Sequence, residues 1–183
     1  ESDLRYISWV EGNRKRVAEM SNGRIGYIHV PDTQEGGITE FVKGFYSQQD
    51  KDAWLIDERF NGGGYIPAFF VEFLRREVSS KMKARGWKDV WFPQGTLDGP
   101  KAMLINEYAG SGGDMLPWLF QTQKVGPLIG MRTWGGLVGI NGSAPLVDGG
   151  FLTSPGFGIY DPLKGEWIAE NKGVDPDIEV DAR

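Results

Sequence analysis

Ser111 is the residue whose surroundings most favour nucleophilic chemistry. It lies in Ala109-Gly110-Ser111-Gly112-Gly113-Asp114, between a segment that predicts a strand and one that predicts a helix. Small neighbours allow a sharp turn that presents the serine hydroxyl, and the next backbone N–H can stabilise developing negative charge. The motif departs from Gly-x-Ser-x-Gly because Ala109 stands two residues before the serine. Taken alone, such a serine more often serves a loop or a helix cap.

A second glycine-rich turn, Asn61-Gly62-Gly63-Gly64, also follows an apolar segment and precedes a predicted helix. No Gly-Lys-Ser/Thr follows it, which excludes a nucleotide P-loop, and the glycine spacing does not fit a dinucleotide fold. The functional interpretation that remains is a backbone oxyanion hole, and the alternative is a tight turn. The carboxyl ends of parallel strands are where α/β sites form, so the two glycine-rich turns together favour a site there.

A serine nucleophile needs a base, and the sequence offers no clear one. The one histidine, His29, lies inside an apolar strand pattern, where a hydrogen-bonded structural role is the more common. No lysine stands out as the partner of a Ser–Lys dyad. Glu170 could orient a histidine, although its surroundings are equally typical of a solvated turn.

Hydrophobic periodicity predicts alternating strands and helices along most of the chain. Strands are expected at 24–30, 53–57, 101–106 and 128–130, helices at 5–20, 37–49, 67–78 and 115–123, a surface excursion at 79–99, and short strands within 143–183. This order predicts one α/β domain over residues 1–183 with a mostly parallel sheet flanked by helices.

Composition narrows the functional classes. The chain has 183 residues, no cysteine and a formal net charge of −5, which excludes disulfides and disfavours a nucleic-acid or membrane surface. The acidic C-terminal segment lacks the residue order of a calcium loop, so no metal or cofactor is expected. The seven tryptophans, Trp134 among them, are expected to lie mostly in the core. The chain begins Glu1-Ser2-Asp3, which we interpret as a piece of a longer protein or a trimmed product.

Several motifs carry a family resemblance, and they occur in the same order as in that family. They are Gly26–Asp32, Asp57–Gly64, Asn106–Asp114, Ile129–Ile140 and Glu170–Asp177. The sequence resembles the tricorn-type branch of the C-terminal processing peptidases, and the resemblance covers nearly the whole chain. It implies the crotonase-like α/β fold of those serine peptidases, in a subdomain that carries the nucleophile.

The resemblance assigns roles residue by residue. Ser111 matches the nucleophile, the amides of Gly64 and Gly112 match the oxyanion hole, and Glu170 matches the glutamate of a Ser–His–Ser–Glu tetrad. The histidine and second serine of that tetrad lie in an earlier subdomain of the family, separated by a PDZ domain. Neither is present here, and His29 matches a strand histidine instead.

Three departures from related patterns bear on mechanism and specificity. C-terminal processing peptidases have a lysine base where this chain has Gly136, which favours the tricorn-type tetrad. Gly112 stands where the archaeal tricorn pattern has aspartate, which keeps the backbone N–H and removes a charge. Residues 79–99 also differ, so no preference for the residue before the cleaved bond is transferred.

The resulting hypothesis is a cytoplasmic serine endopeptidase subdomain that cleaves short to medium peptides, with its histidine supplied from outside the chain. The resemblance implies the remaining subdomains of the parent protease as partners and a homo-oligomer, a hexamer. No nucleic acid, membrane or cofactor is expected to take part. The alternatives are a non-catalytic peptide-binding or assembly domain and, less well supported, an acyl-CoA enzyme of the related fold.

Overall fold

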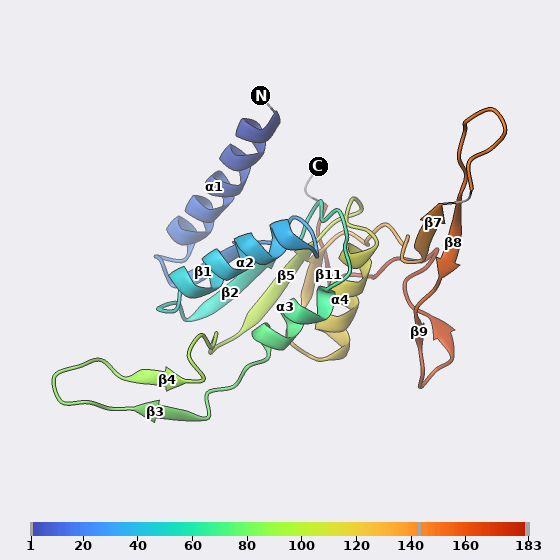
Figure 1. Cartoon of the computed structure of the whole chain (residues 1–183). Coiled ribbons are helices and arrows are strands. Elements are labelled where there is room, and N and C mark those ends of the chain that lie inside the picture. The colour runs from blue at the N-terminus through green and yellow to red at the C-terminus, as the bar shows by residue number, and fades with distance from the viewer. Residues whose placement is uncertain (1, 143, 182–183) are drawn as a thin grey trace.

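The computed structural model describes residues 2–142 and 144–181 and is built around a parallel β-sheet (Figure 1). The helices are α1 (Ser2–Met20), α2 (Glu35–Ser47), α3 (Pro67–Leu74) and α4 (Gly112–Thr122). The strands are β1 (Ile25–His29), β2 (Ala53–Asp57), β3 (Ser80–Met82), β4 (Val90–Phe92), β5 (Lys101–Ile105), β6 (Leu128–Gly130), β7 (Gly139–Gly142), β8 (Thr153–Phe157), β9 (Tyr160–Asp161), β10 (Glu166–Trp167) and β11 (Ile178–Glu179).

The central sheet has five strands in the order β1-β2-β5-β6-β11, and every neighbouring pair is parallel. This confirms the predicted parallel α/β architecture. Because all carboxyl ends lie at one edge, the turns after β2 and β5 are neighbours. The turn after β2 contains Gly64, and the turn after β5 contains Ser111.

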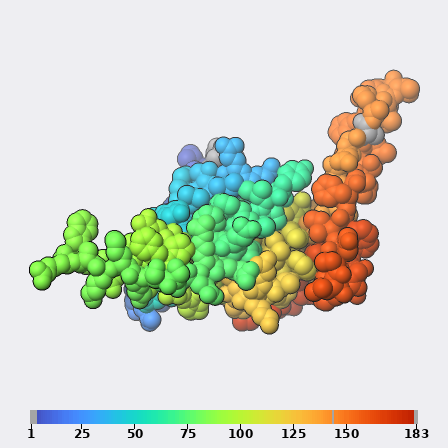
Figure 2. Space-filling model, turned by 60° about the horizontal axis from the view of Figure 1, so that its bottom comes forward, coloured from blue at the N-terminus to red at the C-terminus, as the bar shows by residue number. Residues whose placement is uncertain are grey.

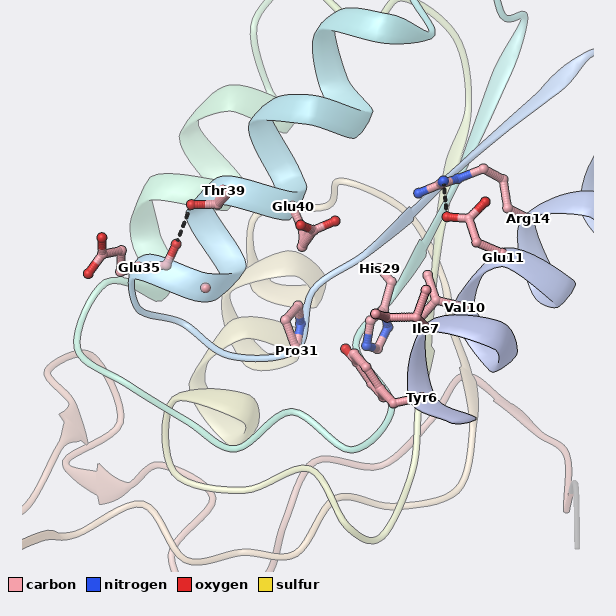
Figure 3. A pocket seen from close by; sticks show the side chains of 11 residues that line it. Tyr6, Ile7, Val10, Glu11, Arg14, His29, Pro31, Glu35, Thr39 and Glu40 are labelled. Carbon is pink, nitrogen blue, oxygen red and sulfur yellow. Dashed lines mark hydrogen bonds and ion pairs between the residues drawn. The ribbon is translucent and has the colours of Figure 1, made fainter. Parts of the chain in front are cut away.

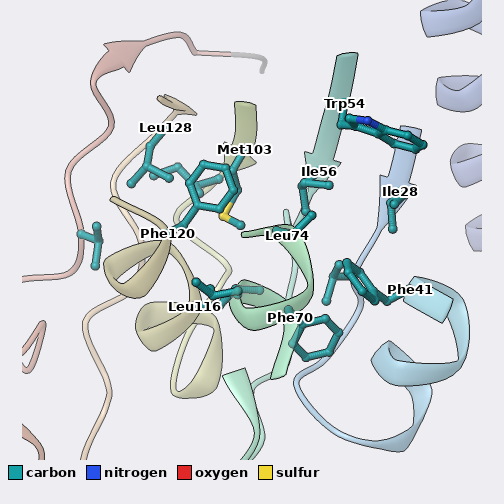
Figure 4. Close-up of a cluster of buried hydrophobic side chains, with 14 of the residues drawn as sticks. Ile28, Phe41, Trp54, Ile56, Phe70, Leu74, Met103, Leu116, Phe120 and Leu128 are labelled. Atoms are coloured by element: carbon teal, nitrogen blue, oxygen red, sulfur yellow. The ribbon is translucent and has the colours of Figure 1, made fainter. Parts of the chain in front are cut away.

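The core lies between one face of the sheet and α2, α3 and α4 (Figure 4). Strand side chains on this face alternate with those on the other face, as the period of two requires. The fully buried members include Ile28, Ile56 and Met103 from the strands, Phe41 from α2, Phe70 and Leu74 from α3, and Leu116 and Phe120 from α4. Burial of each such side chain stabilises the folded chain by about 1.5–3 kcal/mol. This packing holds the strands and helices, and therefore the turns that follow β2 and β5, in place.

Helix α1 packs on the opposite side of β1 from α2. Ile28 contacts α2 at Gly44, whereas the next residue, His29, contacts the rings of Tyr6 and Trp9 on α1. Successive strand residues point to opposite faces, so the two helices enclose β1 from both sides.

Two hairpin-bearing segments project from the body in opposite directions (Figure 2). One carries β3 and β4, within the surface excursion predicted for 79–99, and the other carries β7 and β8. The expected helix at 67–78 ends already at Leu74, where the chain leaves the core for the first hairpin. The helix expected at 115–123 begins three residues earlier, at Gly112, directly after the serine.

Candidate active site

Ser111 sits at the junction of β5 and α4 in an unusual backbone conformation. Its φ is 57° and its ψ is −117°, which non-glycine residues rarely adopt and which costs about 1–3 kcal/mol. Its backbone N–H donates to Asp114 Oδ2 at 2.8 Å. The side chain is half-buried, so the hydroxyl is presented on a constrained turn rather than on a free loop.

The glycine-rich turn after β2 lies directly against this serine. A Cβ added at Gly63 would be 3.1 Å from Ser111 Oγ, and one added at Gly112 would be 2.7 Å from Gly64 N. Within residues 2–142 and 144–181, neither the Gly64 N–H nor the Gly112 N–H donates to a protein acceptor. Two adjacent backbone donors are therefore left without partners beside a serine hydroxyl.

Hydrogen bonds to the neighbouring carbonyls fix the direction of both donors. Thr33 N–H donates to Gly63 C=O at 2.8 Å, and the N–H of the same planar trans peptide, that of Gly64, must point the opposite way. The Ser111 carbonyl accepts the N–H groups of Asp114 and Met115 at 2.9 and 3.1 Å. The Gly112 N–H therefore points away from the helix, as expected at a helix N-terminus.

Asn61 holds the glycine turn from within. Its Oδ1 accepts the Gly63 N–H at 2.8 Å, and its Nδ2 donates to the Val30 carbonyl at 3.0 Å. The Asn61 side chain is fully buried, so these bonds are shielded from water. Sequence reasoning quoted Asn61 within the motif and gave it no role of its own.

Asp114 ties the serine turn to the loop after β6. Its buried carboxylate accepts the Thr133 hydroxyl and Gly135 N–H on Oδ1, and the Ser111 and Gly136 N–H groups on Oδ2. Burial raises the pKa of Asp114, while these hydrogen bonds lower it. Sequence reasoning missed this role, although the serine-to-acid spacing of three resembles a capping box and could have indicated it.

Glu170 is half-buried and is not the freely solvated turn residue that its sequence context also allowed. Its Oε2 accepts the N–H groups of Leu137 and Val138, both at 2.8 Å. The residues on either side, Ala169 and Asn171, have φ values of 55° and 58°. Such left-handed residues concentrate at functional turns, where the surrounding structure maintains them.

The structure brings Ser111, Gly64 and Gly112 into direct proximity and joins Glu170 to them indirectly. Asp114 contacts the Ser111 N–H and the Gly136 N–H, and Glu170 contacts the next two amides along that loop. Among the described residues, no hydrogen bond joins Glu170 to Ser111. A further side chain placed between Ser111 and Glu170 would connect these two residues in one site.

No base reaches the serine from within the described part of the chain. His29 Nδ1 is 2.8 Å from the Asp57 carbonyl oxygen, and its ring packs against Tyr6 and Trp9. This confirms the hydrogen-bonded structural role that was favoured for His29. Burial lowers its pKa. Over residues 2–142 and 144–181, the Ser111 hydroxyl has no hydrogen bond to a histidine or a lysine.

Glu58 is a further buried acid near the serine turn that sequence reasoning missed. It is fully buried, and neither carboxyl oxygen has a hydrogen-bond partner within the described residues. Burial raises its pKa well above the ordinary value, and the nearby Asp114 and Asp57 act in the same direction. Burial therefore favours the protonated form of the Glu58 carboxyl.

The expectation that the tryptophans lie mostly in the core is wrong. Trp54 is 2% exposed, but Trp134 is 68% exposed and stands beside the serine turn. A Cβ added at Gly110 would be 2.6 Å from Trp134 Cε3, so the ring lies over the residue preceding Ser111. Trp87, between β3 and β4 on a projecting segment, and Trp167, on the short strand β10, are also exposed.

No group of three or more His, Cys, Asp or Glu side chains in the described part of the chain is arranged to hold a metal ion. None of the helices described is both long enough and apolar enough to cross a membrane.

Comparison with known proteins identifies the family. The model of "Peptidase family S41" matches residues 24–180. This chain belongs to peptidase family S41. It is 39% identical over 180 residues to the tricorn protease of Thermoplasma volcanium, covering 97% of this chain and 17% of that relative. It is 38% identical over 184 residues to tricorn protease homolog 1 of Streptomyces coelicolor, covering 100% of this chain and 17% of that relative.

Solved structures of S41 proteins agree with this assignment. The crystal structure of the tricorn protease matches with a TM-score of 0.90 and 40% identity, covering 97% of this chain and 17% of that chain. The photosystem II D1 C-terminal processing protease matches with a TM-score of 0.61 and 22% identity, covering 86% and 42%, which shows the fold alone. The expected tricorn-type S41 fold is confirmed, and the chain spans about a sixth of the tricorn relatives it matches.

Proposed function

We propose that this chain is the nucleophile-bearing subdomain of a serine endopeptidase that cleaves short to medium peptides. The observation that carries the proposal is that the amides of Gly64 and Gly112, beside the Ser111 hydroxyl, have no partner in the described part of the chain. Preorganised backbone donors of this kind stabilise the oxyanion of acyl transfer, typically by about 2.7–4 kcal/mol for each donor.

The chemistry follows from this arrangement. A histidine from outside the chain takes the proton of the Ser111 hydroxyl, and the oxygen attacks the peptide carbonyl carbon. The carbonyl oxygen becomes an oxyanion that accepts the N–H groups of Gly64 and Gly112. Collapse breaks the C–N bond, and the histidine returns the proton to the leaving amine. Water then hydrolyses the acyl-enzyme by the same route in reverse.

Glu170 supports the incoming base in this proposal. One of its oxygens is held by two backbone amides, which fixes the carboxylate relative to the loop that Asp114 joins to the serine. A fixed carboxylate can orient a histidine and stabilise its protonated form. We assign Glu170 to a Ser–His–Ser–Glu tetrad whose histidine and second serine come from the rest of the parent protease.

The wider assignments belong to the same proposal. The partners are peptide substrates and the remaining subdomains of the parent protease, over a single 183-residue domain in this chain. The assembly is a homo-oligomer, a hexamer, in the cytoplasm. Homologous tricorn proteases support these assignments because they match this chain over almost its whole length.

The test uses Ser111→Ala in the complete parent protein. We expect peptide hydrolysis to fall by about 10⁶-fold in kcat, as for loss of other serine nucleophiles. Ser154→Ala, on the exposed strand β8, is the matched control and should leave hydrolysis unchanged. Normal turnover by Ser111→Ala would refute the assignment.

The isolated chain separates the proposal from a non-catalytic binding or assembly domain, which the missing base also favours. We expect the purified chain to fold and to hydrolyse peptides barely above background. The parent protein should be active. An inactive parent that still binds peptides would support the binding domain, and rapid turnover by the isolated chain would show that it contains its own base.

A further inference from the structure

The loop between β1 and α2 is bonded to the glycine turn that carries Gly64. The Val30 carbonyl accepts a hydrogen bond from Asn61 Nδ2 at 3.0 Å, and the Pro31 carbonyl accepts the Gly62 N–H at 2.9 Å. Pro31 also lines a cavity of about 610 Å³ between α1 and α2 (Figure 3). The loop therefore lies between that cavity and the candidate oxyanion hole, and its contacts with the glycine turn decide where the turn sits.

Thr33, in the same loop, fixes the peptide that carries the first oxyanion donor. Its N–H donates to the Gly63 carbonyl at 2.8 Å, and its own carbonyl accepts the Ile66 N–H at 3.1 Å. A Cβ added at Gly64 would be 2.5 Å from the Thr33 carbonyl oxygen, so the two backbones are in close contact. The Thr33 backbone thus holds the Gly64 N–H by bonds that come before and after it in the turn.

The side chain of Thr33 meets the second donor residue, Gly112. A Cβ added at Gly112 would clash with Thr33 Oγ1, so this oxygen fills the space that a side chain would occupy there. Thr33 is fully buried, and its hydroxyl has no hydrogen-bond partner among the described residues. A buried hydroxyl without a partner lowers stability, so its contribution here is the volume that it fills rather than a bond.

We infer that Thr33 is a positioning residue that sets the spacing between the two oxyanion donors, the N–H groups of Gly64 and Gly112. Its backbone holds the peptide of the first donor, and its side chain keeps the start of α4 from moving closer to that peptide. This role rests on the proposed function, because the spacing affects a reaction rate only if the two amides bind the oxyanion. The motif that carries the family resemblance ends at Asp32 and gave Thr33 no role.

The rate should be sensitive to this spacing. Backbone donors stabilise an oxyanion when both lie about 2.7–3.1 Å from it, and a displacement of about 1 Å can cost about 100-fold in rate. Thr33→Ala removes the atoms that touch Gly112 and leaves a void into which the turn can move. Thr33→Val keeps the branched shape and removes the unpartnered hydroxyl, so it should preserve the spacing and should not lower stability.

The first experiment is peptide hydrolysis by the complete parent protein. We expect Thr33→Ala to lower kcat by about 10–100-fold with KM within about twofold, because the oxyanion forms only in the transition state. Thr33→Val should stay within about threefold of the wild type in kcat. Thr39→Ala is the matched control, since the exposed Thr39 hydroxyl on α2 donates to the Glu35 carbonyl at 2.9 Å (Figure 3) and should leave both constants unchanged.

The second experiment does not depend on activity. In ¹⁵N NMR spectra of the labelled chain, Thr33→Ala should shift the amide signals of Gly64 and Gly112, whereas Thr33→Val should shift them less and Thr39→Ala should leave them unchanged. Urea unfolding of the same variants checks that each is folded, and the midpoint for Thr33→Val should be no lower than that of the wild type.

A fully active Thr33→Ala parent would overturn the inference, and so would unchanged Gly64 and Gly112 signals in that variant. A Thr33→Val parent as slow as Thr33→Ala would show that the hydroxyl itself acts, which also overturns the spacing role. Failure of the proposed function has a different signature, because Ser111→Ala would then stay active. Amide shifts in Thr33→Ala would in that case still support the role of Thr33 in spacing the two amides.

Discussion

The buried carboxylate of Asp114 accepts the backbone N–H of Ser111 at 2.8 Å and so holds the turn that presents the serine. The same carboxylate binds two backbone amides, of Gly135 and Gly136, from the loop that reaches toward Glu170. One side chain thereby connects the nucleophile turn to the rest of the candidate site. Its loss should disturb both folding and chemistry.

Asp114→Asn tests this connection. An asparagine presents an NH₂ group to donors that need acceptors, so we expect the free energy of unfolding to fall by about 2–4 kcal/mol. Urea denaturation of the chain measures it. The matched control is Asp175→Asn, which breaks an exposed ion pair with Arg132 and should cost less than about 1 kcal/mol. Similar losses in both variants would contradict the role of Asp114.

Gly112→Ala tests the close approach of the two glycine turns. The added methyl group would clash with Thr33 Oγ1 and would lie 2.5–2.7 Å from the backbone of Gly64. We expect a loss of about 1–3 kcal/mol in the free energy of unfolding, and Thr33→Ala should restore only part of it because the backbone clash remains. A Gly112→Ala chain as stable as the wild type would contradict the observed packing.

The control for that substitution is Gly12→Ala. Gly12 lies in α1, and a Cβ there would have no neighbour within 4 Å. Alanine is the better helix former, so this variant should be more stable by about 0.5–1 kcal/mol. Thermal or urea unfolding of both glycine variants under one set of conditions gives the comparison.

Glu58→Gln tests the raised pKa of this buried acid. The pKa of Glu58 is higher in the folded chain than in the unfolded chain, so above the unfolded pKa of about 4.3 the folded chain holds a proton that the unfolded chain has lost. Stability should therefore fall as pH rises, by up to about 1.4 kcal/mol per pH unit, until the folded pKa is reached. Glutamine removes this contribution and should flatten the profile above the unfolded pKa of about 4.3.

Urea unfolding at several pH values measures that profile. Glu72→Gln, at an exposed position, should keep the slope of the wild type. Asp114 contributes in the same direction because burial raises its pKa as well, so part of the slope should survive in Glu58→Gln. An unchanged slope in the variant would show that Glu58 is not the buried acid responsible.

The role of Glu170 can be tested with one variant that removes its carboxylate group and a second that removes only its charge. Glu170→Ala removes the acceptor of the Leu137 and Val138 amides, whereas Glu170→Gln keeps an oxygen there. Hydrogen exchange of those two amides should accelerate in the alanine variant and stay slow in the glutamine variant. In the parent protein both variants should hydrolyse peptides more slowly than the wild type. A fully active Glu170→Gln parent would exclude the proposed role of the charge.

The order of strands and helices could be predicted from the sequence because it depends on local patterns. The apolar segments that became β2 and β5, and the glycine clusters that follow them, carry their own periodicity and turn chemistry. The helix boundaries were predicted less accurately. Helix α3 ends at Leu74, where its contacts with the core end, and not at residue 78 as its local pattern indicated. The exposure of Trp134 was predicted wrongly because a tryptophan has the same composition signal in a core and on a functional surface.

By itself the sequence determined the nucleophile candidate, Ser111, the two glycine turns and the absence of a nearby base. Only the tertiary structure decided that β2 pairs with β5, which places Gly64 against Gly112 and leaves both amides without a partner among the described residues. It also decided that Asp114 and Glu170 meet the same loop. These contacts join residues far apart in the chain, and such pairings depend on how the sheet and core close rather than on any local pattern.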